Sequence, residues 1–115
     1  MKSVTLSRTI DAPPTVVRES MNELDQFMRA SGFDEVHVAG KTVRVVNEMG
    51  IATIELTLDL VDRPDADLAY EQREGIFAEM RTAYTVTPVP NGSEVVATTE
   101  FALDVAIVGD VLDST

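Results

Sequence analysis

The sequence predicts a single α+β domain, residues 1–115, with a curved antiparallel sheet of six to seven strands and an N-terminal pair of helices. Two observations lead to this fold class: apolar residues recur at helical spacing between Thr15 and Ala30, and they alternate strictly from Ala52 to Leu60. Turn signals divide the rest of the chain into short strands. A chain of 115 residues has room for one core and needs neither metal nor disulfide to fold.

The chain begins with a strand that leads into a helical segment. Val4, Leu6 and Ile10 alternate with hydroxyl residues, which predicts a half-buried strand whose apolar face Arg8 interrupts. The run from Asp11 to Pro14 ends this strand, because proline suits the first turn of a helix, where its missing N–H costs nothing.

The helical segment runs from Thr15 to Ala30 and shows one apolar stripe. Asn22 interrupts it, which predicts two short helices at an angle, and Ser31-Gly32 ends the second. The stripe consists of Val17, Met21, Leu24 and Met28.

Strands are expected throughout Phe33–Asp104. Gly40-Lys41 predicts a tight hairpin, and the alternation of Ala52–Leu60 predicts that even-numbered side chains are buried there and odd-numbered ones exposed. Gly75 marks a bulge or a turn, and Pro88–Ser93 is a strong turn signal.

The end of the chain departs from this pattern of strands. Apolar residues in Ala106–Thr115 have the spacing of a beginning helix, but too few residues follow to complete it. We therefore expect a truncated or barely begun C-terminal helix, with residues after Ile107 poorly ordered or ordered only by a neighbouring chain.

Twenty acidic against nine basic residues give a net charge of −11, which repels phosphate backbones and argues against nucleic-acid binding. Acid excess, only two lysines and few large aromatics are typical of proteins from salt-loving cytoplasms. The start has no apolar secretory region and the longest apolar run, Val105–Val108, is too short to span a membrane. With no cysteine in the chain, we expect a cytoplasmic protein.

Candidate catalytic and metal-binding residues are scarce. His37 is the only histidine and lies in a valine-rich strand, so we interpret it as a surface or half-buried residue and expect no metal site. The chain has no glycine-rich phosphate loop, so we expect no nucleotide cofactor. No catalytic carboxylate pair can be selected from twenty, although Glu74 would matter if it pointed inward beside Gln72.

One face of the predicted sheet combines apolar side chains with a few hydroxyl and amide groups. A small-molecule pocket needs this mixture, because apolar area gives affinity and sparse polar groups fix orientation. A plain core under a helix would show the same mixture. The candidate ligand-binding residues are Tyr70, Gln72, Met80, Thr82, Tyr84, Thr99 and Phe101.

The strand Ser7–Pro14, with its Ile-Asp-Ala-Pro signature, followed by Val16-Val17 at the start of a helix, resembles the polyketide cyclase/dehydrase-like proteins. These belong to the START-type helix-grip superfamily (SRPBCC), and the order of elements extends the resemblance over the whole chain. The signature is structural, because it turns the first strand into the helices. The resemblance implies a helix-grip fold in which the sheet curves around a long C-terminal helix, and the end of this chain departs from that pattern.

The resemblance implies an apolar small molecule as partner, and three functions stay open. The first is a binding or carrier protein for a lipid- or polyketide-like ligand. The second is a cyclase- or dehydratase-type enzyme in which Tyr84, Gln72 or Glu74 donates or accepts a proton. The third is an interaction module that uses an uncovered face of the sheet, which a large exposed apolar patch would favour.

Overall fold

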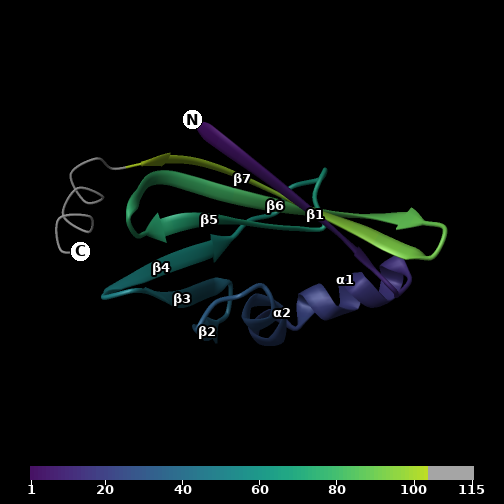
Figure 1. Ribbon diagram of the computed structural model, residues 1–115, viewed down its shortest axis with the longest axis horizontal. Helices are drawn as coiled ribbons and strands as arrows, with labels where there is room; N and C mark the ends of the chain where they lie inside the picture. Colours follow the sequence, from purple (N-terminus) through teal and green to yellow (C-terminus); the bar gives the residue numbers. More distant parts are fainter. Residues whose placement is uncertain (104–115) are drawn as a thin grey trace.

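The computed structural model describes residues 1–103, which form one antiparallel sheet and two short helices (Figure 1). This confirms the predicted α+β class, with six strands after the helices. The expected C-terminal helix and the expected poor order after Ile107 concern residues outside the described ones. In chain order the elements are β1 (Lys2–Ile10), α1 (Pro14–Asn22), α2 (Leu24–Ala30), β2 (Glu35–Ala39), β3 (Thr42–Met49), β4 (Ala52–Leu60), β5 (Leu68–Glu74), β6 (Phe77–Val89) and β7 (Gly92–Leu103).

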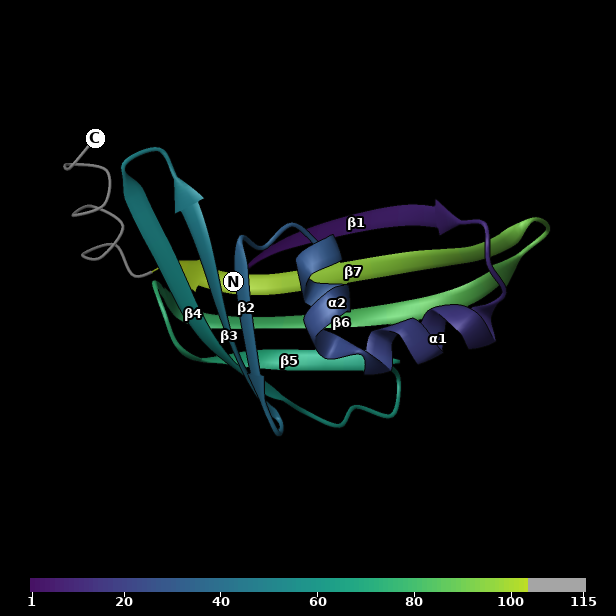
Figure 2. The ribbon, with the colours of Figure 1, turned by 90° about the horizontal axis from the view of Figure 1, so that it is seen from below.

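The seven strands pair in the order β1-β7-β6-β5-β4-β3-β2, so β1 and β2 are the two edges. Figure 2 shows β2, β3 and β4 running steeply across the direction of β5, β6, β7 and β1. The pairing of β4 with β5 shifts register between Thr57 and Leu58, and such bulges bend a sheet and increase its twist. The sheet is therefore curved, as predicted.

The helical segment is divided where the sequence predicted. Pro14 opens α1, where no N–H is needed, and α1 ends at Asn22. The following Glu23 leaves helical geometry at φ −87° and ψ 72°, so α2 begins in a new direction. Neither helix of residues 1–103 is long and apolar enough to cross a membrane.

The core lies between the two helices and the face of the sheet that they cover, called here the inner face. Val17 and Met21 of α1 and Met28 of α2 are buried against it. The predicted alternation of β4 holds only in part: the even-numbered Ala52, Ile54 and Leu60 are half-buried, and of the odd-numbered residues Thr53 and Glu55 are exposed whereas Thr57 and Asp59 are half-buried. Leu56 and Leu58 of β4 are buried, and in β6 the buried residues are Met80, Thr82, Tyr84 and Val86.

The first strand is a correction to the expected half-buried one. Val4 and Leu6 of β1 lie on the inner face, yet they are 46% and 68% exposed. Alternation tells which side chains share a face, but it does not tell what covers that face. Helix α1 packs against β6 and β7, and Figure 2 shows β1 on the far side of β7 from α1.

A polar clamp fixes α1 beside the sheet. Strand β6 extends beyond the start of β5, so its backbone near Val86 has no strand partner on that side. There Asp67 accepts a hydrogen bond from the Val86 N–H at 2.7 Å, and Arg18 of α1 donates to the Val86 carbonyl at 3.1 Å. The two side chains also pair with each other at 2.8 Å. Side chains thus complete an open strand edge and set the position of α1.

Candidate functional site

The seven predicted ligand-binding residues lie together on the inner face. Directly paired residues of antiparallel strands point to the same side of a sheet. Thr82 pairs with Tyr70 on β5 and with Thr99 on β7, while Met80 pairs with Phe101. Thr82, Tyr70, Met80 and Tyr84 are buried, whereas Gln72, Thr99 and Phe101 are only half-buried. The structure brings these residues together, and ligand binding by them stays a prediction.

Two tyrosine hydroxyls meet under the helices. The hydroxyl oxygens of Tyr70 and Tyr84 are 3.2 Å apart, and Phe27 of α2 packs edge-on against the Tyr84 ring at 5.2 Å between centroids. Burial raises the pKa of Tyr70 above its ordinary value, and the neighbouring Tyr84 adds to this rise, so the Tyr70 phenol stays neutral at physiological pH. The Tyr84 hydroxyl therefore has a partner within the protein.

Two threonines carry polar groups from the core toward the open side of the sheet. The hydroxyls of Thr82 and Thr99 are 2.8 Å apart, and Thr82 also donates to the Met80 sulfur at 3.7 Å. Thr99 pairs in turn with Val4 of the edge strand. The Thr99 hydroxyl is therefore the outermost of these groups and lies next to exposed apolar surface.

Gln72 and Glu74 do not take the roles considered for them. The Gln72 amide donates to the Phe77 carbonyl at 2.8 Å and accepts from the Phe77 N–H at 3.2 Å, so it acts as a backbone substitute across the β5–β6 turn. Glu74 is exposed and does not point inward. A Cβ at Gly75 would lie 2.3 Å from the Gln72 oxygen, so a larger residue there would displace this side chain. Gln72 therefore holds the turn, Glu74 faces solvent, and neither is placed for proton transfer on the inner face.

The inner face stays open over the edge strand. Val4 and Leu6 of β1 are exposed, and beside them Val95 and Ala97 of β7 are half-buried. On α1, Val17 faces the sheet and Arg18 reaches Asp67 beside β5.

Since residues on a helix are about 100° apart, Val16 lies on the opposite side of α1, toward β7 and β1. It is 49% exposed. We call the surface formed by Val4, Leu6, Val16, Val95 and Ala97 the α1–β1 groove.

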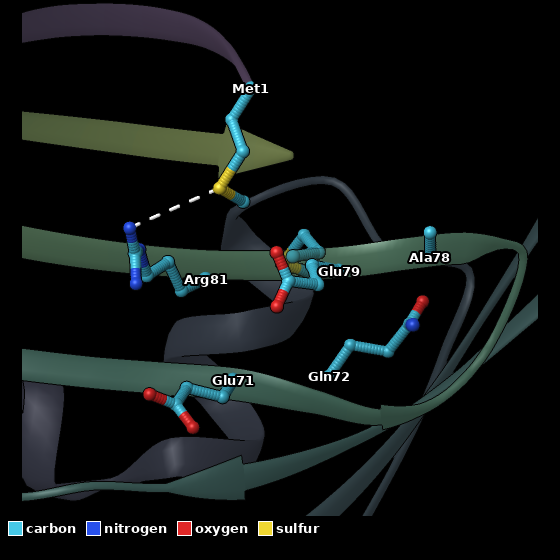
Figure 3. A pocket seen from close by; sticks show the side chains of 7 residues that line it. Met1, Glu71, Gln72, Ala78, Glu79 and Arg81 are labelled. Carbon is cyan, nitrogen blue, oxygen red and sulfur yellow. Dashed lines mark hydrogen bonds between the residues drawn. The ribbon is translucent and has the colours of Figure 1, made fainter. Parts of the chain in front are cut away.

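A separate hollow lies at the far end of β5 and β6 and has a volume of about 160 Å³ (Figure 3). Its walls include Gln72 and Met80 together with Glu71, Glu79 and Arg81, and the Arg81 guanidinium lies 3.9 Å from the Met1 sulfur. Ligand pockets usually enclose roughly 300–1,000 Å³. This hollow is therefore too small and too polar for a lipid-like molecule.

Metal-binding and catalytic groupings are sparse in residues 1–103. His37 is exposed on β2, as expected for a surface residue. No group of three or more histidine, aspartate or glutamate side chains within that range is placed to hold a metal ion. The inner face thus carries hydroxyl groups and apolar area as its chemistry.

The sequence interpretation missed the groove because it selected buried positions. Val4 and Leu6 were assigned to a half-buried strand, and Val16 to the start of a helix. No signal in the sequence identifies this surface, because the pairing of β1 with β7 at one edge appears only in the assembled sheet, and an edge strand is covered only if another element reaches it.

Comparisons with known proteins agree with this arrangement. A family model described as "Polyketide cyclase / dehydrase and lipid transport" matches residues 1–114. No match was found among curated proteins.

Three solved structures show the same fold at low identity. The protein TTHA0849 from Thermus thermophilus is 20% identical with a TM-score of 0.74, covering 98% of this chain and 82% of that one. The Zhui aromatase/cyclase from Streptomyces sp. R1128 is 18% identical with a TM-score of 0.74, covering 89% and 68%. A START superfamily protein from Mycobacterium smegmatis is 12% identical with a TM-score of 0.68, covering 96% and 89%.

Proposed function

The chain belongs to the polyketide cyclase / dehydrase and lipid transport family, with a helix-grip-like fold, and we propose that it is a cytoplasmic binding or carrier protein for an apolar small molecule. The α1–β1 groove is the proposed binding surface. The observation that carries this proposal is the exposure of Val4, Leu6 and Val16 around one strip of the inner face.

Apolar area of this kind favours an apolar occupant. Burying apolar surface contributes about 25 cal/mol per Å², so covering three aliphatic side chains supports measurable affinity. Soluble proteins leave contiguous apolar surface exposed mainly where something binds. The half-buried Val95 and Ala97 extend the apolar area beside Leu6 on the same face of the sheet.

The hydroxyl groups beside the groove supply orientation. Thr99 is half-buried, pairs with Val4 and is bonded to Thr82, so its hydroxyl retains capacity for one further hydrogen bond. Tyr84 lies deeper, behind Phe27. In this proposal an apolar ligand lies along β1 and β7, with the Thr99 hydroxyl beside it at the Val4 end.

The enzyme alternative has a narrower basis. Of the three residues considered for proton transfer, only Tyr84 has its polar atom on the inner face and away from the backbone, and this hydroxyl is bonded to Tyr70. The interaction alternative uses the same exposed groove. A protein partner would cover this exposed surface without any small molecule binding there. Binding of a small apolar probe therefore separates the carrier function from the interaction module.

The test is fluorescence titration with a neutral apolar probe, dansyl-labelled undecanol. Ala97 pairs with Leu6 and Tyr84 on the inner face, and the adjacent Val96 pairs with Ser7 and Thr85 on the opposite face. We expect Ala97→Phe to place its ring where the ligand lies and to weaken binding about tenfold or more, a loss of about 1.4 kcal/mol in binding free energy. The matched control Val96→Phe should bind like the wild type.

Two outcomes would contradict the proposal. In one, the wild type shows no saturable binding of the probe. In the other, Ala97→Phe binds the probe as well as the wild type does, with both proteins folded by circular dichroism.

A further inference from the structure

Arg8 stands apart from the other arginines. The chain has twenty acidic residues and nine basic ones. Within residues 1–103, six of the seven arginines lie within 4.0 Å of a carboxylate oxygen, and Arg8 is the one that does not. Among the described residues Arg8 has no carboxylate within this distance, so its exposed guanidinium is free to pair with an external anion. The paired arginines are Arg18, Arg29, Arg44, Arg63, Arg73 and Arg81.

The position of Arg8 connects it to the α1–β1 groove. Arg8 pairs with Val95, and Val95 pairs with the buried Val86, so Arg8 lies on the inner face. Residues i and i+2 of a strand point to the same face and are about 7 Å apart, so Arg8 lies about 7 Å beyond Leu6 on the inner face. Its side chain is exposed. A guanidinium thus lies at one end of an apolar strip.

The charges around this end leave Arg8 accessible to an anion. Glu94 pairs with Thr9 and therefore faces the opposite side of the sheet. Asp11 follows β1 in the turn before α1 and is exposed. Lys2 shares the inner face with Arg8, but it lies at the other end of the strand, about 20 Å away.

We propose that Arg8 binds the carboxylate headgroup of a fatty-acid-like ligand whose tail lies along β1 over Leu6 and Val4. This proposal rests on the proposed function and names the ligand class for the same groove. The planar guanidinium matches a carboxylate with two parallel hydrogen bonds, which a lysine cannot reproduce. The tail would run about 13 Å from Arg8 to Val4, the length of four strand residues.

The net charge favours a singly charged headgroup. A protein with a net charge of −11 repels anions, and this repulsion grows with the negative charge of the ligand. One arginine compensates one negative charge. A carboxylate therefore fits this site better than a doubly charged phosphate monoester does.

The test compares two probes of equal length, dansyl-labelled undecanoate and dansyl-labelled undecanol, by fluorescence titration. Arg8→Gln removes the charge and keeps polar length, and we expect it to weaken undecanoate binding about tenfold or more while leaving undecanol binding unchanged. The matched control is Lys41→Gln in the β2–β3 hairpin, which makes the same change in net charge far from the groove. It should leave both affinities unchanged.

The outcomes separate this inference from the proposed function. If Arg8→Gln leaves undecanoate binding unchanged while the wild type binds undecanol, the headgroup inference is overturned and the proposed function stands. An equal loss for both probes would make Arg8 a structural residue and would also overturn it. If the wild type binds neither probe, the proposed function fails, and the headgroup inference fails with it.

Discussion

The hydroxyl pair of Tyr70 and Tyr84 allows a quantitative prediction about the core. Both side chains are buried, and their hydroxyl oxygens are 3.2 Å apart. Tyr84→Phe keeps the ring and its edge-on contact with Phe27, and removes only the hydroxyl. The buried Tyr70 hydroxyl then loses its hydrogen bond to Tyr84.

The magnitude follows from what each substitution leaves behind. A hydrogen bond contributes about 1 kcal/mol net, and an unpaired buried polar group costs about 1–3 kcal/mol, so each single variant should lose about 2 kcal/mol. Replacing both tyrosines by phenylalanine leaves no unpaired hydroxyl of this pair and should cost only about 1 kcal/mol. The double variant should therefore be about 3 kcal/mol more stable than the sum of the single effects predicts.

Urea unfolding of Tyr70→Phe, Tyr84→Phe and the double variant measures this coupling, provided that the m-values stay constant. Additive losses would refute the reasoning, because they would mean that each hydroxyl has another partner. A Tyr84→Phe variant as stable as the wild type would do the same, and it would restore a ligand or water as the partner of Tyr84.

Three further predictions concern the turn, the clamp and the charge. Asp67→Ala removes a carboxylate bonded to a β6 N–H and to α1, and should cost about 1.5–3 kcal/mol in urea unfolding, whereas the exposed Asp65→Ala should change little. Gly75→Ala forces a Cβ to 2.3 Å from Gln72 and 2.4 Å from Leu56, and should cost about 1–3 kcal/mol; stability equal to wild type would contradict the packing of this turn. The melting temperature should rise from low to molar potassium chloride, since salt screens the self-repulsion at −11, and a flat or falling curve would remove the argument from acidity.

Periodic patterns in the sequence predicted the elements of the fold well. The division of the helical segment at Asn22 and the turn at Gly75 were confirmed, because both depend on local backbone preferences. The alternation of Ala52–Leu60 identified the face that carries Leu56 and Leu58, because side chains of a strand alternate regardless of context.

Features that depend on distant neighbours could not be predicted. Alternation placed Val4 and Leu6 on one face, but only the assembled sheet shows that β1 is an edge beyond the reach of the described helices. Glutamine is a residue type that fits a ligand pocket. The Gln72 amide instead bonds the backbone of Phe77, and this depends on where β6 begins after the turn. The candidate residues share one face of the sheet, ligand binding by them stays a prediction, and the accessible surface beside them was overlooked.

The most direct test of ligand binding at the α1–β1 groove is mass spectrometry of small molecules recovered from the protein after purification without denaturant. We predict that an apolar molecule copurifies with the wild type and with Val96→Phe, and is lost from Ala97→Phe, whose side chain lies between Leu6 and Tyr84. Recovery of equal amounts from Ala97→Phe, or of none from the wild type, would contradict binding in this groove.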